Sequence, residues 1–263
     1  MIDIHLWGIS GTVVDAGRPG RGWLGAGRGG AVDLVSHALA NRLVGNQETA
    51  AAFETSGGLS FSVTSATMVV ITGGVASVEV TSGPPLGWGV PVALPAGATV
   101  RIGRLLHGAR VYVAVRGGLV GRGGATHLGP DPLTPAADHP AARAEPATTL
   151  QLWPGPRVDW FGPEAFELLL SASFTVTDTS RVGTRLHGPE LRRSRTEELP
   201  SEGMVEGAVQ VPPDGDPILM LAGHPATGGY PVIAVIDPAD IPHLAQAAPG
   251  TTLRFRRAVL RPE

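Results

Sequence analysis

Short apolar runs recur along this chain about every 8–12 residues, and glycine and proline separate them. In the first run, Ile2, Ile4 and Leu6 alternate with polar residues, as in a half-buried strand. The 37 glycines and 24 prolines are spread among the runs, so they indicate turns and not disorder. The pattern predicts a mainly β fold built from barrels or sandwiches. Further strands are predicted at 59–63, 68–72, 77–81, 99–102, 110–115, 149–152, 173–178, 208–211, 218–221, 232–235 and 252–255.

A few short helices interrupt the strands. They are predicted over 34–44, 164–170 and 238–246. Asp33, Pro163 and Asp237 are suited to begin them, and Gly45 is suited to end the first. The buried side of the first helix is predicted to comprise Leu34, Val35, Ala38, Leu39 and Leu43.

The segment 130–146 is rich in proline and alanine and has little strand or helix pattern. It is predicted to be a long connection. We therefore expect one large domain over 1–263, divided into lobes at 1–148 and 149–263.

The residue types that are missing exclude several kinds of chemistry. All 20 basic residues are arginine, so the chain cannot supply a Schiff-base lysine, a phosphate-loop lysine, a biotin-carrying lysine or a Ser-Ser-Lys amidase site. It has no cysteine for a disulfide, a thiol nucleophile or a metal. The histidines show no metal-binding spacing, so no metal site is expected.

Location and broad partner class follow from the remaining composition. No apolar run approaches the roughly 18–20 residues that cross a bilayer, and the first residues lack the pattern of a signal peptide. A cytoplasmic protein without a membrane partner is expected. The net charge is −3 and no basic stripe is present, so nucleic acid is not an expected partner.

Two neighbouring segments carry the clearest local pattern. Residues 207–211 and 218–222 are apolar, and Pro212-Pro213-Asp214-Gly215 lies between them, so a β-hairpin is predicted. The Thr-Gly-Gly-Tyr-Pro loop at 227–231 follows, and its paired glycines allow the backbone to approach another group closely. A Gly-x-Gly-x-x-Gly match at 25–30 lacks a preceding strand, so we interpret it as a surface loop and not as a dinucleotide site.

Charged pairs offer candidate binding groups. Asp15 and Arg18 lie three residues apart and could hold a planar carboxylate, urea or lactam, or could only satisfy each other in a structural turn. Arg181 and Arg185 could both reach an anion, or could pair with Asp178 and nearby carboxylates.

Acid–base candidates lie in the glycine-rich turns. Glu202 could act as an acid or base, or could simply be solvated. His224 could transfer protons near neutral pH, or could be an ordinary surface histidine. Gln210 could present its amide to a ureido group, or could face water from a strand.

Several motifs occur together in the order known from one family. They are 12–18 (TVVDAGR), 40–46 (ANRLVGN), 178–189 (DTSRVGTRLHGP), 201–203 (SEG), 210–213 (QVPP) and 227–231 (TGGYP). They resemble the family that unites the C-type subunit of 5-oxoprolinase with allophanate hydrolase subunit 2, and that is similar to the biotin-dependent carboxyltransferase domain of urea amidolyase. The resemblance runs from Gly11 to about Phe255.

The resemblance implies a cyclophilin-like β-barrel architecture in two subdomains, with a pocket in the cleft between them. It favours catalytic roles for Glu202, His224 and Asp15. Expected substrate contacts come from Arg18, Arg181, Arg185, Ser201, Gln210, Thr227, Gly228, Gly229 and Tyr230.

The chain also departs from the family's motifs. Ser180 stands where the family has an aspartate before the first arginine. Gly223, Pro225, Ala226 and Val232 occupy an acidic, an amide, a hydroxyl and a lysine position. These losses weaken the case for carboxyl transfer and strengthen a role in binding or assembly.

Three functions follow from the resemblance. The first is membership of an ATP-dependent 5-oxoprolinase complex that opens a lactam. It needs a cognate first subunit, of the allophanate hydrolase 1 type or the 5-oxoprolinase B type, together with an A-type subunit. The second is a carboxyltransferase component acting on urea or a related amide, with biotin carried by another chain. The third is a non-catalytic structural or regulatory partner. No cofactor is expected in this chain itself, because it has no nucleotide motif and ATP would be used by the complex.

Overall fold

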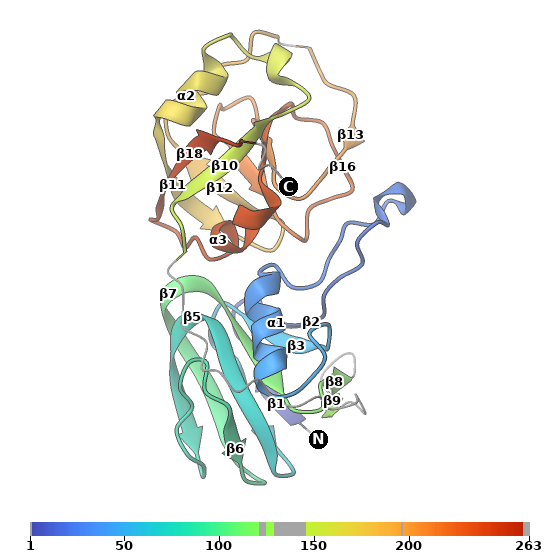
Figure 1. Ribbon diagram of the computed structural model, residues 1–263, viewed down its shortest axis with the longest axis vertical. Coiled ribbons are helices and arrows are strands. Elements are labelled where there is room, and N and C mark those ends of the chain that lie inside the picture. The colour runs from blue at the N-terminus through green and yellow to red at the C-terminus, as the bar shows by residue number, and fades with distance from the viewer. Residues whose placement is uncertain (1, 121–124, 129–145, 196, 260–263) are drawn as a thin grey trace. The chain divides into compact units, whose positions relative to one another are not determined.

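The computed structural model describes residues 2–120, 125–128, 146–195 and 197–259. The chain forms two compact units (Figure 1), which are 1–17 with 33–145 and 18–32 with 146–263. The predicted lobes at 1–148 and 149–263 do not include this exchange of 18–32 into the second unit. Most of the predicted connection, 130–145, lies outside the described residues.

The first unit is built on one large antiparallel sheet with strand order β2-β3-β7-β4-β1-β9-β8, and β5 pairs with β6 and β7. The strands are β1 (Ile2–Leu6), β2 (Thr12–Val14), β3 (Ala52–Thr55), β4 (Ser60–Val63), β5 (Thr67–Thr81), β6 (Val92–Leu94), β7 (Thr99–Val115), β8 (Leu119–Val120) and β9 (Ala125–Leu128). Phe53 and Phe61 stack with ring centroids 5.5 Å apart in the core of this unit.

Two long strands replace four predicted short ones. The runs 68–72 and 77–81 are both part of β5, and 99–102 and 110–115 are both part of β7. The two strands pair from Val69 opposite Val115 to Thr81 opposite Thr99. Glycines that we interpreted as turns are absorbed instead at register shifts within the ladder, where a bulge bends a strand without ending it.

Helix α1 (Leu34–Leu43) begins as predicted, because Asp33 Oδ1 accepts the Ser36 N–H at 2.9 Å. Its predicted buried side is partly wrong. Val35 is 61% exposed, whereas His37 and Asn41 are buried. The polar residues turn inward because the Asn41 amide donates to the Ala50 carbonyl at 2.8 Å, which ties the helix to the following loop.

The second unit is a closed barrel with strand order β10-β17-β14-β15-β12-β11-β18. Its strands are β10 (Thr149–Pro154), β11 (Ser173–Thr179), β12 (Gly183–His187), β14 (Ala208–Gln210), β15 (Ile218–Met220), β17 (Val232–Ile236) and β18 (Thr252–Arg257), and the ribbon β13 (Glu202–Gly203) with β16 (Thr227–Gly228) lies apart from it. A parallel pairing of β10 with β18 closes the barrel. The mainly β fold with few short helices is confirmed.

The predicted hairpin is β14 and β15, paired with Val209 opposite Leu219. The two predicted helices of this unit are α2 (Ala165–Ser171) and a 3-10 turn (Pro238–Asp240) that continues into α3 (Ile241–Ala245). Asp237 caps this turn by accepting the Ala239 N–H at 3.0 Å. Strand β12 lies in the motif 178–189, for which no strand beyond residue 178 was predicted.

Residues 18–32, which we call the arm, pack on the second unit (blue in Figure 1). Arg28 donates two hydrogen bonds of 2.8 Å to the Glu206 carboxylate, and both side chains are mostly buried. The Gly29 N–H donates to the Ala222 carbonyl at 3.0 Å, and Arg181 donates to the Gly30 carbonyl at 2.5 Å. These contacts fix the base of a segment that would otherwise be a glycine-rich loop.

No helix in the described part of the chain is long and apolar enough to cross a membrane.

The first prediction concerns the arm. In Glu206→Gln the arm loses a bidentate charge-assisted partner, so tryptic cleavage after Arg21 should accelerate several-fold. Glu190→Gln is the matched control, because it removes an exposed ion pair with Arg192 that contributes little to stability. Peptide mass spectrometry at short digestion times measures the rate. Equal cleavage of both variants would contradict the anchoring role of Glu206.

The second prediction concerns His37. Burial lowers its pKa below 6.5, although backbone groups of Val14 and Ala50 and the charges of Glu54 and Asp15 oppose the shift. The folded chain therefore holds the neutral ring while the unfolded chain takes up a proton. The free energy of unfolding should fall as pH drops below about 6.5, by up to about 1.4 kcal/mol per pH unit.

Urea denaturation at several pH values tests this expectation. His37→Asn should have a flatter pH dependence between about 7 and 5 than the wild type, and His5→Asn, which removes an exposed histidine, should retain the wild-type slope. Identical slopes for wild type and His37→Asn would refute the assignment.

Candidate functional site

The ribbon β13–β16 joins two of the motifs that stood out in the sequence. Glu202 pairs with Gly228, and Gly203 pairs with Thr227. The Met204 N–H donates to the Ala226 carbonyl at 2.9 Å and extends the pairing toward His224. The Ser-Glu-Gly turn and the Thr-Gly-Gly-Tyr loop are therefore adjacent, although they are well separated in the chain.

Glu202 is held by a cation. Arg157 Nε donates to Glu202 Oε2 at 3.0 Å, and Arg157 Nη2 donates to Glu202 Oε1. Both side chains are about one-third exposed. The arrangement is a bidentate fork that orients the carboxylate on the ribbon.

The side chains of Met204 and Gln210 approach Gly228 closely. A Cβ at Gly228 would lie 2.6 Å from Met204 Cε and 2.7 Å from Gln210 Nε2. The Gln210 amide is buried and donates to the Tyr230 carbonyl at 3.0 Å. Gln210 thus braces the Thr-Gly-Gly-Tyr loop from β14, and it does not face water.

Tyr230 is oriented by Arg193, whose guanidinium lies 5.6 Å from the centre of the tyrosine ring. The Arg193 Nε donates to the Val211 carbonyl at 3.1 Å. Burial lowers the pKa of Arg193 from its ordinary value, and the nearby Tyr230 and Asp214 oppose this shift. The arginine remains a cation at neutral pH and stabilises the loop.

His224 is buried, and its ring has a defined hydrogen-bond partner. Nδ1 lies 2.8 Å from the Pro225 carbonyl oxygen. A carbonyl oxygen only accepts, so Nδ1 carries the proton and Nε2 is the basic atom of the neutral ring. The His224 carbonyl also faces the arm, because a Cβ on Gly27 would lie only 2.8 Å from that oxygen.

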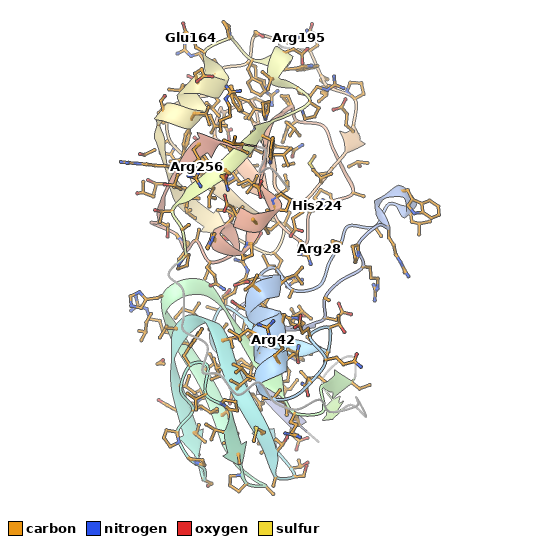
Figure 2. The ribbon with its side chains drawn as sticks, in the orientation of Figure 1. Arg28, Arg42, Glu164, Arg195, His224 and Arg256 are labelled. Carbon is orange, nitrogen blue, oxygen red and sulfur yellow. The ribbon has the colours of Figure 1, made fainter. Side chains whose placement is uncertain are left out.

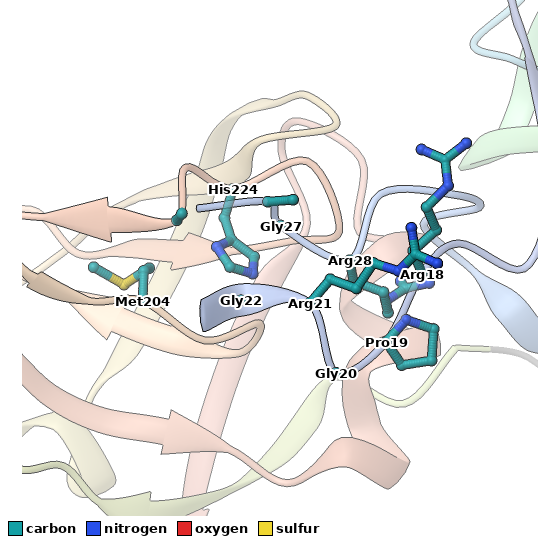
Figure 3. Close-up of a pocket in the computed structure, with 11 residues that line it drawn as sticks. Arg18, Pro19, Gly20, Arg21, Gly22, Gly27, Arg28, Met204 and His224 are labelled. Carbon is teal, nitrogen blue, oxygen red and sulfur yellow. The ribbon is translucent and has the colours of Figure 1, made fainter. Parts of the chain in front are cut away.

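His224 lines a pocket of about 100 Å³ between the ribbon and the arm (Figure 3). Figure 3 shows His224 between Met204 on one side and the side chains of three arginines on the other. Its lining is Arg18, Pro19, Gly20, Arg21, Gly22, Ala26, Gly27, Arg28, Met204, His224 and Ala226.

The pocket is strongly cationic. Of its three arginines, Arg28 is neutralised by Glu206. No carboxylate of the described residues pairs with Arg18 or Arg21. Two arginines with open donors beside a basic imidazole nitrogen can hold a small anion and exchange a proton with it. Figure 2 marks Arg28 and His224 on the second unit.

The other expected site residues lie elsewhere. Arg181 supports the arm through the Gly30 carbonyl. Arg185 is exposed on β12 and lies 3.6 Å from Asp214. Asp15 belongs to the first unit and accepts the Gly17 N–H at 2.8 Å, which closes its own turn. Ser201, Thr227 and Gly229 are on the exposed or partly exposed surface of the ribbon.

All four positions that lack the family's polar groups have defined neighbours, and at Pro225 the neighbour is the His224 ring. A Cβ at Gly223 would lie 2.8 Å from the Arg181 carbonyl. Ala226 lines the pocket. Val232 belongs to an apolar cluster with Met204, Ala208 and Met220. A small residue is therefore required at position 223, where the backbone of Arg181 packs. Position 232 suits an apolar residue because the side chains around it are apolar.

Several residues of the site carried no sequence signal. Arg28 stands in the glycine-rich segment 25–30 that we interpreted as a surface loop, and no recognised motif contains Arg21, Glu206, Arg157 or Arg193. A basic segment without any acidic residue at 16–32 was the one available sign. Among the described residues, no group of three or more histidines, cysteines or carboxylates could hold a metal ion.

The first unit contains a buried hydrogen-bonded pair, Glu54 and Tyr112, that has a structural role. Tyr112 donates to Glu54 Oε2 at 2.7 Å and accepts the Asp33 N–H at 2.8 Å. Burial, followed by the charge of Glu54, raises the pKa of Tyr112 well above 10.0, so the phenol remains protonated.

Comparisons with known proteins agree with this architecture. The chain is 32% identical to the C-type subunit of 5-oxoprolinase from Escherichia coli, over 97% of the chain and 90% of that protein. It is 27% identical to urea amidolyase of Saccharomyces cerevisiae, over 97% of the chain but only 16% of that protein. The crystal structure of TTHA0988 superposes with a TM-score of 0.85 at 33% identity, and the match covers 97% of this chain and 56% of that one.

The sequence model described as "Carboxyltransferase domain, subdomain A and B" matches residues 24–123 and 122–257, which is most of the chain. The chain belongs to this carboxyltransferase-domain family.

Proposed function

We propose that this chain is a subunit of an ATP-dependent 5-oxoprolinase complex, a cyclic-amide hydrolase, and that it is not active alone. The observation that carries the proposal is the cationic pocket formed by Arg18, Arg21 and His224. The full-length similarity to the C-type subunit of 5-oxoprolinase supports it. The complex would include a first subunit, of the 5-oxoprolinase B type or the allophanate hydrolase 1 type, and an A-type subunit, in the cytoplasm.

The chemistry of the substrate fits the pocket. 5-Oxoproline is a small lactam with one carboxylate, and two guanidinium groups without a carboxylate partner can bind that anion through paired hydrogen bonds. His224 Nε2 then lies beside the bound molecule and can take up or deliver a proton at the ring amide. The arm holds both arginines, so substrate binding depends on its anchoring to Glu206.

Glu202, Gln210 and the 227–230 loop act as positioning residues in this proposal. Glu202 is neutralised by Arg157, so it orders the ribbon beside the pocket instead of serving as a free base. The chain has no lysine and no phosphate-binding loop, so ATP is used by the other subunits.

Carboxyl transfer to urea or a related amide is the second candidate, because two urea amidolyases are relatives at 27% and 28% identity. The same arginines would hold the anionic carboxyl group of a carboxybiotin. The biotin would be attached to another chain, because this chain has no lysine to carry it. Decarboxylation of free carboxybiotin that depends on urea would identify this function. Glutamate release from 5-oxoproline would identify the first.

The third prediction tests substrate binding. In the reconstituted complex with ATP, Arg18→Ala and Arg21→Ala should each raise the KM for 5-oxoproline by about tenfold or more, since each removes a charge-assisted hydrogen bond. Arg256→Ala is the control, because Arg256 is an exposed arginine of the same unit on β18 and does not line the pocket (Figure 2). Unchanged KM values in both pocket variants, with the complex intact, would leave a non-catalytic role for the chain.

The fourth prediction tests proton transfer. An asparagine at 224 can still donate to the Pro225 carbonyl but lacks an atom equivalent to Nε2. His224→Asn should therefore lower kcat by about a hundredfold or more while the KM and the melting temperature stay close to wild type. A full rate in His224→Asn would show that the ring has only a structural role.

A further inference from the structure

The tip of the arm is an ordered apolar surface. It forms a 3-10 turn, Gly22–Leu24, in which Trp23 is 83% exposed and Leu24 is 58% exposed. The Leu24 N–H donates to the Arg21 carbonyl at 3.0 Å, and Gly25 closes the turn in the left-handed region with φ of +75°. The turn is therefore formed by its own backbone while both large side chains remain in water. Adjacent exposed tryptophan and leucine side chains are typical of an interaction surface.

The base of the arm is held by hydrogen bonds, whereas the side chains of its tip are exposed. Arg28 is locked to Glu206, Gly29 is bonded to Ala222, and Gly30 accepts a hydrogen bond from Arg181. Val32 is buried in the core of the second unit. Because these contacts fix the arm before any partner binds, a partner that captures the tip loses little conformational entropy.

The charge around the tip restricts what can cover it. The arm carries three arginines and no carboxylate, whereas the whole chain has a net charge of −3. No carboxylate of the described residues pairs with Arg18 or Arg21. The matching surface is therefore an apolar pocket edged by carboxylates.

We propose that Trp23 and Leu24 insert into such a pocket on the partner subunit of the hydrolase complex, which makes the arm tip the anchor for assembly. This inference rests on the proposed function for the identity of the partner. The relatives favour a second protein as the occupant. The matched region is only 56% of TTHA0988 and 16% of yeast urea amidolyase, so in both proteins it is joined to further polypeptide.

Docking at the tip also affects the pocket. Arg21 and Gly22 line the pocket and directly precede Trp23 in the chain. A partner seated on Trp23 therefore lies beside the anion site and excludes water from it, which strengthens the hydrogen bonds of the arginines. Assembly and ligand binding are coupled in this way, and the ligand raises the affinity for the partner by the same factor.

The experiment titrates the full chain with a B-type subunit by isothermal calorimetry in the absence of substrate. Trp23→Ala should weaken binding about 30-fold or more, as expected for a central tryptophan anchor. Trp23→Phe should recover part of the affinity, and added salt should weaken wild-type binding. Leu106→Ala is the matched control, because Leu106 is 60% exposed but lies on β7 in the first unit. Melting temperatures should not change, since Trp23 is 83% exposed.

Each outcome assigns the tip. Equal affinities for wild type and Trp23→Ala, or no binding of the B-type subunit to wild type, would overturn the proposal. A wild-type dimer that dissociates in Trp23→Ala in sedimentation velocity would assign the tip to a second copy, and Trp23-dependent binding to phosphatidylglycerol vesicles would assign it to lipid. Trp23-dependent assembly without glutamate release would refute the 5-oxoprolinase reaction and leave the docking inference standing.

Discussion

The mostly buried ion pair between Arg28 and Glu206 is the contact on which the candidate site depends. It joins the arm to the loop before β14, and the two partners are 178 residues apart in the sequence. A pair of this kind is stabilising only when its geometry satisfies both groups, as the two 2.8 Å bonds do here. Without it the arm would depend on the contacts of Gly29, Gly30 and Val32, and Arg18 and Arg21 would be held less firmly relative to His224.

The ribbon supplies the other wall of the pocket by a different physical means. Its order comes from backbone pairing between Glu202 and Gly228 and from the buried Gln210 amide on the Tyr230 carbonyl. Arg157 neutralises Glu202, and Arg193 stacks on the ring of Tyr230. The cations on this side are occupied by structural partners, whereas no carboxylate in the described part of the chain pairs with Arg18 or Arg21 on the arm. In the proposed function, this asymmetry favours ligand binding by the arm and support by the ribbon.

The sequence predicted those parts of the fold that local chemistry controls. The cap at Asp33, the β14–β15 hairpin and the close approach at Gly228 follow from residue types and short spacings. The long strands β5 and β7 were divided in the prediction because a glycine in a bulge and a glycine in a turn look alike until the partner strand is known. The inward orientation of His37 likewise depends on contacts that helical periodicity does not contain.

The site was predictable only in part for the same reason. His224 and Arg18 were identified from their local contexts, but the residues that make them a pocket come from elsewhere in the chain. Glu206 has no motif of its own and acts only because the arm returns to it. Arg181 was expected to bind substrate, whereas its guanidinium supports the Gly30 carbonyl and a small residue at 223 makes room for its backbone. The substitution of small and apolar groups at 223 and 232 is thus compatible with an intact pocket, because its polar groups are supplied by the arm.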